Sequence, residues 1–288
     1  MVSKAGIHVT FDRNVCNAIR SRLRKEKSPD KDVYTEILAQ IRAGTIYPYL
    51  SEATLTFELF CLEERLLILA SYFACAAERP KLPQPSAKAE QWVRDLLAIG
   101  FRVLRGPSRI GLSSSSFINL NHGWAEDLRF PLEKRLERAT NLIERFEQLG
   151  PSRLKRWGNE LAKAHGLDRT THQNDYWSPC PKILWFEGLM AEYQKPRCCS
   201  SKKDFFGKLR KIFSDWFDLD AVASHYGYGL DYFCTDEIGR GTVGDTIFHP
   251  DNLKILEREF NVHVVSAEEL SMIALTAAQE SFRGNQGE

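Results

Sequence analysis

The pattern of hydrophobic and polar positions begins with a short β-rich run and continues with helical spacing. Residues 6–11 alternate apolar and polar side chains and stop at a polar turn, which predicts a strand. Apolar positions three or four apart then predict helices over 14–25 and 32–43. We expect a third helix, capped by Ser51, to run to about Ala77, before a proline-rich connection at 78–86.

The rest of the chain continues this alternation of helices and short β-rich runs. The expected helices cover about 87–99, 125–149, 152–165, 203–216 and 250–260, and another begins near 218. The expected strands cover 101–104, 230–235 and 262–265. Residues 166–201 show little periodicity. Strands that alternate with helices predict an α/β fold, and the last strand, helix and strand predict a parallel βαβ unit.

The composition is that of a folded protein with almost no net charge. Of 288 residues, 43% are hydrophobic and 27% charged, which excludes disorder as a description of the whole chain. Lys and Arg number 39 against 38 Asp and Glu, so a nucleic-acid binder would have to rely on local basic patches.

The apolar stretches and the cysteines bear on location. The longest apolar stretch, Leu66 to Ala77, is too short to span a membrane, and the first residues lack the pattern of a secretory signal. Seven cysteines without a Cys-x-x-Cys pair favour reduced thiols. We therefore expect a cytoplasmic protein without a membrane span.

Acidic residues gather at the ends of the predicted strands and on the helices beside them. They are Asp12, Glu58, Asp220, Asp236 and Glu237. Ligands of parallel α/β sheets collect at the carboxyl ends of the strands, where converging carboxylates repel one another unless a cation neutralises them. Oxygen ligands of this kind suit Mg²⁺ or Mn²⁺, which can promote attack of water on a phosphodiester.

Each of these carboxylates also has a purely structural interpretation. An acidic residue near a strand end is commonly a helix cap or solvated, and Asp218 and Asp220 can both cap the helix that follows them. Glu58 differs because its sequence neighbours are apolar on nearly every side, so its charge needs a partner or a metal.

The same residues resemble the motifs of the PIN domain, a nuclease family that includes toxin ribonucleases of toxin–antitoxin pairs. Residues 12–15 (Asp-Arg-Asn-Val) resemble its Asp-x-Asn signature, and 49–58 resemble the segment with its second acidic residue. Residues 220–223 resemble its Asp-Ala motif, 231–237 its last strand-end motif, and 262–270 its closing strand. The resemblance implies a three-layer α/β/α nuclease with a mostly parallel sheet that cleaves single-stranded or structured RNA using Mg²⁺ or Mn²⁺.

The resemblance also implies roles for individual residues. The metal ligands would be Asp12, Glu58, Asp220 and either Asp236 or Glu237, with Asn14 orienting Asp12 and Thr235 supporting the site; the family usually has Asp where this chain has Glu237. One PIN-like domain would cover 1–275, interrupted by a mainly helical insertion at about 113–201 and followed by a C-terminal tail at 276–288. A protein inhibitor or regulator is a possible partner, and the helix at 125–149 can pack internally or across a homodimer.

Three further interpretations remain open. The changed strand-end motif and the long insertion also suit a catalytically silent scaffold that binds RNA or a protein. The first motif resembles haloacid-dehalogenase-like phosphatases as well, with Asp251 in their last acidic motif, although Asn14 stands where their general acid is expected. Nucleic-acid contacts are expected from the basic segment around Phe205 and Phe206 and from the glycine-rich loop 239–244. Alternatively, the basic segment is a solvated helix face over buried phenylalanines. The candidate contacts are Lys202, Lys203, Lys208, Arg210 and Arg240.

Overall fold

A parallel β-sheet lies at the centre of the fold. The structure is a computed structural model, and it describes residues 6–24, 32–61, 63–66, 85–106, 123–125, 129–150, 152–167, 184–195, 199–239 and 246–284. The described residues form five strands, all parallel, in the order β3-β2-β1-β4-β5. Their bounds are β1 Ile7–Phe11, β2 Ile46–Ser51, β3 Arg102–Leu104, β4 Tyr232–Cys234 and β5 His263–Val265. Because the order reverses at β1, the crevice between β1 and β4 is the expected place for a ligand.

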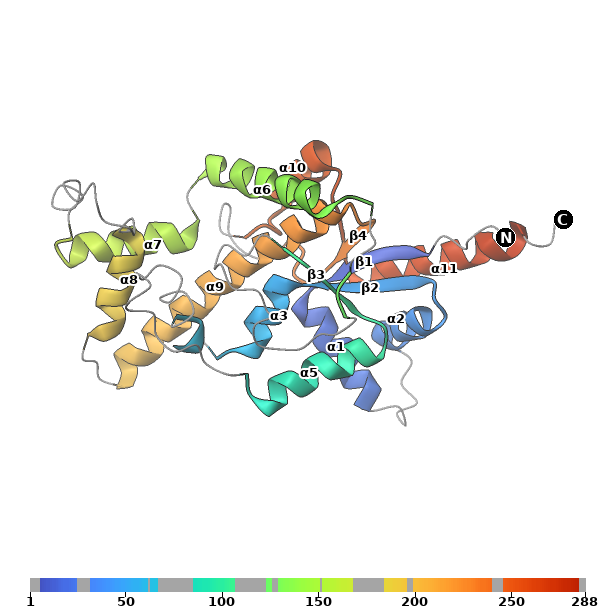
Figure 1. Ribbon diagram of the computed structural model, residues 1–288, viewed down its shortest axis with the longest axis horizontal. Coiled ribbons are helices and arrows are strands. Elements are labelled where there is room, and N and C mark those ends of the chain that lie inside the picture. Colours follow the sequence, from blue (N-terminus) through green and yellow to red (C-terminus); the bar gives the residue numbers. More distant parts are fainter. Residues whose placement is uncertain are drawn as a thin grey trace.

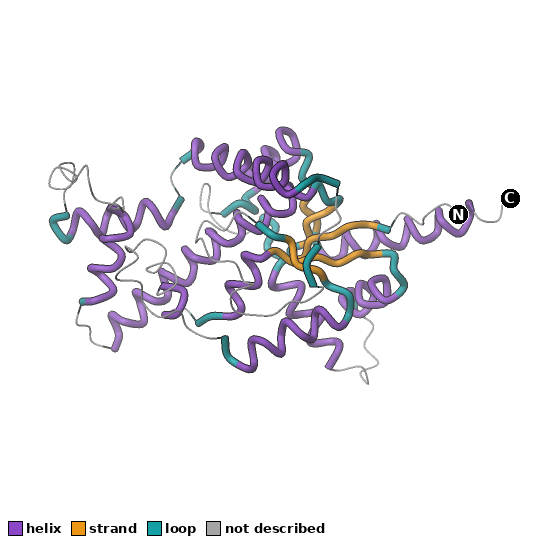
Figure 2. The backbone as a smooth tube through the Cα atoms, in the orientation of Figure 1, coloured by secondary structure: helices purple, strands orange, loops and turns teal. Residues whose placement is uncertain are grey.

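Helices cover both faces of this sheet, so the fold has three layers (Figure 1). One face carries α1 (Arg13–Arg24), α2 (Val33–Arg42), α5 (Ala87–Ala98) and α11 (Ala267–Gly284), whose core includes Val15, Ile37 and Trp92. The other face carries α6 (Leu132–Leu149), α9 (Cys199–Tyr228) and α10 (Pro250–Phe260), whose core includes Leu142 and Val222. The strands are sandwiched between these layers (Figure 2). The predicted three-layer α/β/α class is confirmed.

Local signals explain where several helices begin and end. Asp32 and Ser86 accept hydrogen bonds from the backbone N–H groups of Thr35 and Ala89 and so cap α2 and α5. Helix α10 has Pro250 in its first turn and ends at Asn261, whose φ of 53° is left-handed. These signals are readable in the sequence, and the helix expected at 250–260 has the observed bounds.

Several elements differ from the sequence expectation. Residues 46–51 form β2, although Pro48 within the run argues against a strand. The helix expected from Ser51 to Ala77 ends early: α3 spans Glu52–Leu59, Phe60 is extended, and a helical turn covers 63–66. The rest of that expected helix lies outside the described residues. The two helices expected around 203–228 are a single helix, α9, of 30 residues.

The expected insertion contributes to two parts of the molecule. Within 113–201, α6 packs along α9 and completes a layer over the sheet. Helices α7 (Arg153–Ala164) and α8 (Leu184–Gln194) pack against each other and lie away from the sheet, beside the first half of α9 (Figure 1). Residues 276–284, expected as a tail, continue helix α11.

Candidate functional site

The ends of β1 and β4 are joined by hydrogen bonds that place Asp12 beside Thr235. The backbone N–H of Asp12 donates to the carbonyl of Cys234 over 2.9 Å, which continues the pairing of the two strands by one residue. The Thr235 hydroxyl then donates to Oδ2 of Asp12 over 2.8 Å, and the backbone N–H of Arg13 donates to Oδ1 over 2.6 Å. Both carboxylate oxygens of Asp12 are therefore held in place.

Thr235 connects Asp12 to the rest of the strand-end segment. Its Oγ1 also accepts from Nδ2 of Asn14 over 3.4 Å and from the backbone N–H of Glu237 over 3.2 Å. A hydroxyl has one donor and two lone pairs, so Thr235 uses its full capacity. The arrangement fits the supporting roles predicted for Asn14 and Thr235.

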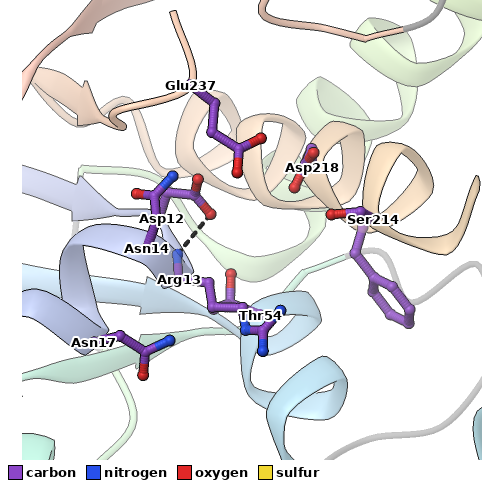
Figure 3. Close-up of a pocket in the computed structure, with 9 residues that line it drawn as sticks. Asp12, Arg13, Asn14, Asn17, Thr54, Ser214, Asp218 and Glu237 are labelled. Carbon is purple, nitrogen blue, oxygen red and sulfur yellow. Dashed lines mark hydrogen bonds between the residues drawn. The ribbon is translucent and has the colours of Figure 1, made fainter. Parts of the chain in front are cut away.

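A cavity of about 160 Å³ opens at this end of the sheet. Its lining includes three carboxylates, Asp12, Asp218 and Glu237, from the end of β1, from α9 and from the segment after β4. Figure 3 shows their carboxyl groups around one space. The remaining lining residues are Arg13, Asn14, Asn17, Thr54, Ser214 and Phe217.

The acidic lining changes the protonation of its own members. Burial raises the pKa of Asp12 to about 6, and the charge of Glu237 adds to the rise, while the hydrogen bonds from Thr235 and Arg13 oppose it. Burial and the charges of Asp12 and Glu237 raise the pKa of Asp218 well above its usual value. The charges of neighbouring carboxylates cause part of both shifts, and a cation would relieve that part.

Arginines border this acidic group. Arg13 lines the cavity. Its pKa is lowered, mainly by burial and also by the neighbouring charge of Arg210, although the charges of Asp12, Asp218 and Glu237 act in the opposite direction. Burial and the charges of Arg13 and Arg210 also lower the pKa of Arg65 to about 9. Positive and negative charges thus lie side by side at the carboxyl edge of the sheet.

The structure separates the two carboxylates that the sequence left as alternatives. Glu237 lines the cavity, whereas Asp236 accepts a hydrogen bond of 2.6 Å from the Tyr34 hydroxyl on α2. The chain direction after Thr235 therefore turns Glu237 toward Asp12 and Asp236 toward the neighbouring helix.

Two other predicted ligands have different outcomes. Asp218 on α9 lines the cavity. Residues two apart on a helix point about 200° apart, so Asp220 points away from the cavity and does not line it. Asp220 is 2% exposed. The carboxylate that α9 supplies is therefore Asp218 and not Asp220. Glu58 belongs to α3, and its side chain lies outside the described residues.

The predicted nucleic-acid contacts are only partly described. Lys203, Lys208 and Arg210 are exposed on α9. The Lys208 ammonium lies 4.7 Å from the centre of the Trp157 ring on α7, and the Phe205 ring also packs against Trp157, 5.3 Å between centroids. The side chain of Lys202, and the whole of Arg240, lie outside the described residues. Phe205 is buried, so it cannot act as a stacking surface for bases.

Sequence reasoning missed part of the cavity lining. Ser214 and Asp218 are four residues apart and so share one face of α9, with Arg210 a further turn back on the same face. A single helix through 203–228 would have predicted this face, but the expectation of a break near residue 217 hid it. Thr54 follows β2, a strand that the sequence analysis did not predict.

Neither a metal cluster nor a membrane span is found in the described part of the chain. No three His, Cys, Asp or Glu side chains there lie close enough together to hold a metal ion. No described helix has the length and apolar character needed to cross a membrane. Asp251, the phosphatase-type candidate, is exposed on α10 and pairs with Lys254, so it does not reach the cavity.

Comparisons with known proteins give no relative. The chain matches no protein-family model, no curated protein and no solved structure.

Proposed function

We propose that this protein is a metal-dependent nuclease that hydrolyses phosphodiester bonds of RNA at the cavity between β1, β4 and α9. The observation that carries the proposal is the grouping of Asp12, Asp218 and Glu237 around one cavity at the carboxyl edge of a parallel sheet. The raised pKa values of Asp12 and Asp218 support it, because a cation relieves the repulsion that causes part of these shifts.

The chemistry of these side chains fits Mg²⁺ or Mn²⁺. Both ions prefer oxygen ligands, and Asp12, Asp218 and Glu237 would hold them. Since no three described acidic side chains form a cluster tight enough for an ion, binding would have to draw these carboxylates together. When bound, the cation would stabilise the negative charge that develops on the phosphodiester.

The residues around the cavity suggest how RNA would be placed. Arg210 and Asp218 share one face of α9, eight residues or about 12 Å apart along the helix axis. A backbone whose cleaved phosphate lies at Asp218 would bring a neighbouring phosphate to Arg210. Arg13, which lines the cavity, would contact the reacting phosphate itself.

A matched pair of variants tests the proposal. Glu237→Gln removes a carboxylate from the cavity, while Asp236→Asn changes the adjacent carboxylate, which Tyr34 holds outside it. With Mg²⁺ or Mn²⁺ and single-stranded RNA, we expect Glu237→Gln and Asp12→Asn to lose cleavage and Asp236→Asn to retain it. Equal activity of Asp12→Asn and the wild type would refute the assignment.

The second candidate function is a catalytically silent scaffold that binds RNA or a protein, including an inhibitor or regulator. Arg13 favours it, because a protein cation that lines the cavity partly offsets the charge of the three carboxylates without a metal. On this hypothesis the wild type cleaves no RNA with Mg²⁺ or Mn²⁺, yet binds RNA with an affinity that falls as salt rises. Cleavage that disappears in Asp12→Asn would eliminate it.

A cytoplasmic location completes the proposal. Cys16, Cys61 and Cys234 are free thiols, which is typical of a reducing compartment. Fractionation of cells that express the tagged protein should recover it with the cytoplasmic markers, and recovery in an exported fraction would contradict this location.

A further inference from the structure

A second cleft lies at the opposite edge of the sheet, where β4 and β5 begin. Its volume is about 520 Å³, and it lies between α6 and the ends of α9 and α10. The residues on which the argument depends are Arg129, Arg138, His225, Tyr226, Arg258 and Glu259. Since β4 ends at the carboxylate cavity and begins at this cleft, the two sites are separate.

His225 is a buried polar group at the wall of this cleft. Its side chain is 1% exposed, and its Nδ1 lies 2.9 Å from the Thr10 hydroxyl of β1. Among the described residues, none gives its Nε2 a hydrogen-bond partner. Because burial lowers the pKa of His225 to about 3, the ring is neutral at pH 7, and the tautomer in which Thr10 donates leaves an N–H donor on Nε2. In that tautomer, a ligand in the cleft can accept a hydrogen bond from Nε2.

Arg138 is held rigidly beside this histidine. Its guanidinium lies between two rings, 4.6 Å from the centre of Phe130 and 4.0 Å from the centre of Tyr226. Its Nε and Nη2 both donate to the backbone carbonyl of Tyr226. A guanidinium that is fixed in this way still has further donors, and it loses little entropy when it binds an anion.

Arg129, Arg138 and Arg258 line the cleft together with two carboxylates, Asp231 and Glu259, so the lining carries an excess of positive charge. Both oxygens of Asp231 accept hydrogen bonds, one from Arg129 and one from the backbone N–H of His8. Both oxygens of Glu259 accept from Arg145, and one of them also accepts from Arg258. Several arginine donors beside the imidazole of His225 match the several oxygens of a phosphate group better than a single carbonyl.

We propose that this cleft binds the phosphate group of a small phosphate ester, with Arg138, Arg258 and His225 as donors to its oxygens. The volume of the cleft exceeds that of inorganic phosphate and suits a ligand of the size of a sugar phosphate or a mononucleotide. The assignment does not depend on nuclease activity, because the site shares no lining residue with the carboxylate cavity.

Calorimetry on the full chain tests this site with inorganic phosphate, ribose 5-phosphate, adenosine 5′-monophosphate and adenosine as probes. We expect both phosphate esters to bind more tightly than inorganic phosphate, and adenosine not to bind. Arg258→Gln should weaken binding about tenfold, the effect of one charge-assisted hydrogen bond. Lys254→Gln, an exposed change on the same helix, should bind as the wild type does. Equal binding of adenosine and its monophosphate, or no binding of any phosphate ester, would overturn the proposal.

A second variant isolates the histidine. The double change Thr10→Val with His225→Phe removes both partners of a buried hydrogen bond and keeps their shapes, so the fold should persist. If the double variant unfolds like the wild type and binds ribose 5-phosphate about tenfold more weakly, the role of His225 is supported; unchanged binding would refute it. Should the double variant fail to fold, Arg258→Gln decides the proposal alone. Asp12→Asn should bind the ester normally, which separates this site from the proposed nuclease.

Discussion

Replacement of Asp12 by Asn should change the pH dependence of stability. The pKa of Asp12 rises from 3.8 to about 6 in the folded protein. Between these values the folded state binds more protons than the unfolded state, so the free energy of unfolding falls as pH rises. A shift of about two pKa units corresponds to about 3 kcal/mol, which the wild type loses between about pH 4 and pH 6 and does not regain above it.

Asn has no such titration, but it makes fewer hydrogen bonds. Its single amide oxygen can accept from Thr235 or from the N–H of Arg13, whereas both oxygens of the Asp12 carboxyl group can accept, also when it is protonated, and the lost bond costs about 1 kcal/mol. We therefore expect Asp12→Asn to be about 1 kcal/mol less stable than the wild type near pH 4 and about 2 kcal/mol more stable near pH 8. Loss of the Asp12 charge also lowers the pKa of Asp218, which adds to the gain.

Urea unfolding monitored by circular dichroism at several pH values from 4 to 8, with a chelator present, measures this difference. Asp204→Asn, a change of an exposed aspartate on α9, serves as the control and should follow the wild type at every pH. Parallel stability curves for Asp12→Asn and the wild type would show that Asp12 does not carry a raised pKa, and would remove the electrostatic support for a cation site.

Three further predictions concern neighbours of the cavity. Thr235→Val removes a hydrogen bond that lowers the pKa of Asp12, so the pKa of Asp12 should rise above about 6. NMR of the carboxyl carbon measures this pKa, and an unchanged value would contradict the role of Thr235. Tyr34→Phe removes the donor to Asp236 and should cost about 1–2 kcal/mol of stability in urea unfolding without changing RNA cleavage; loss of cleavage would return Asp236 to the site. Arg210→Ala should weaken RNA binding and reduce the slope of log affinity against log salt by about one, while Arg210→Lys keeps the slope; equal slopes would exclude a phosphate contact.

The fold could be predicted wherever local signals agreed with the tertiary environment. The helix at 250–260 has a proline at its start and an asparagine at its end, and both signals act within a few residues. Strand β2 could not be predicted in this way, because its position between β1 and β3 stabilises a run that contains Pro48. The 30-residue helix α9 was divided in two because its pattern changes where it passes from α7 and α8 to the sheet.

The candidate site was predictable where strand direction alone fixes a side chain. Asp12 follows one strand and the pair Asp236 and Glu237 follows another, and the carboxyl ends of parallel strands meet at one edge. Strand direction does not decide which of the pair reaches the cavity, because that depends on the turn after Thr235. Asp218 was not predictable, because the side of a helix that faces a cavity depends on the rotation of the helix about its axis. Packing of Val222 against the sheet sets that rotation for α9, and it places Asp218, not Asp220, at the cavity.

Helix α9 therefore explains why one part of the chain serves two separate places. Asp218 lines the carboxylate cavity, and His225, seven residues later and about 10 Å along the axis, lines the cleft at the other edge of the sheet. Most residues between them, including Val222, are buried, and their packing fixes the helix in place. Because a well-packed helix moves as a rigid element, the rotation that brings Asp218 to Asp12 also determines where His225 meets Thr10. The two sites differ in charge and in the ligands proposed for them, but the packing of one helix sets the geometry of both.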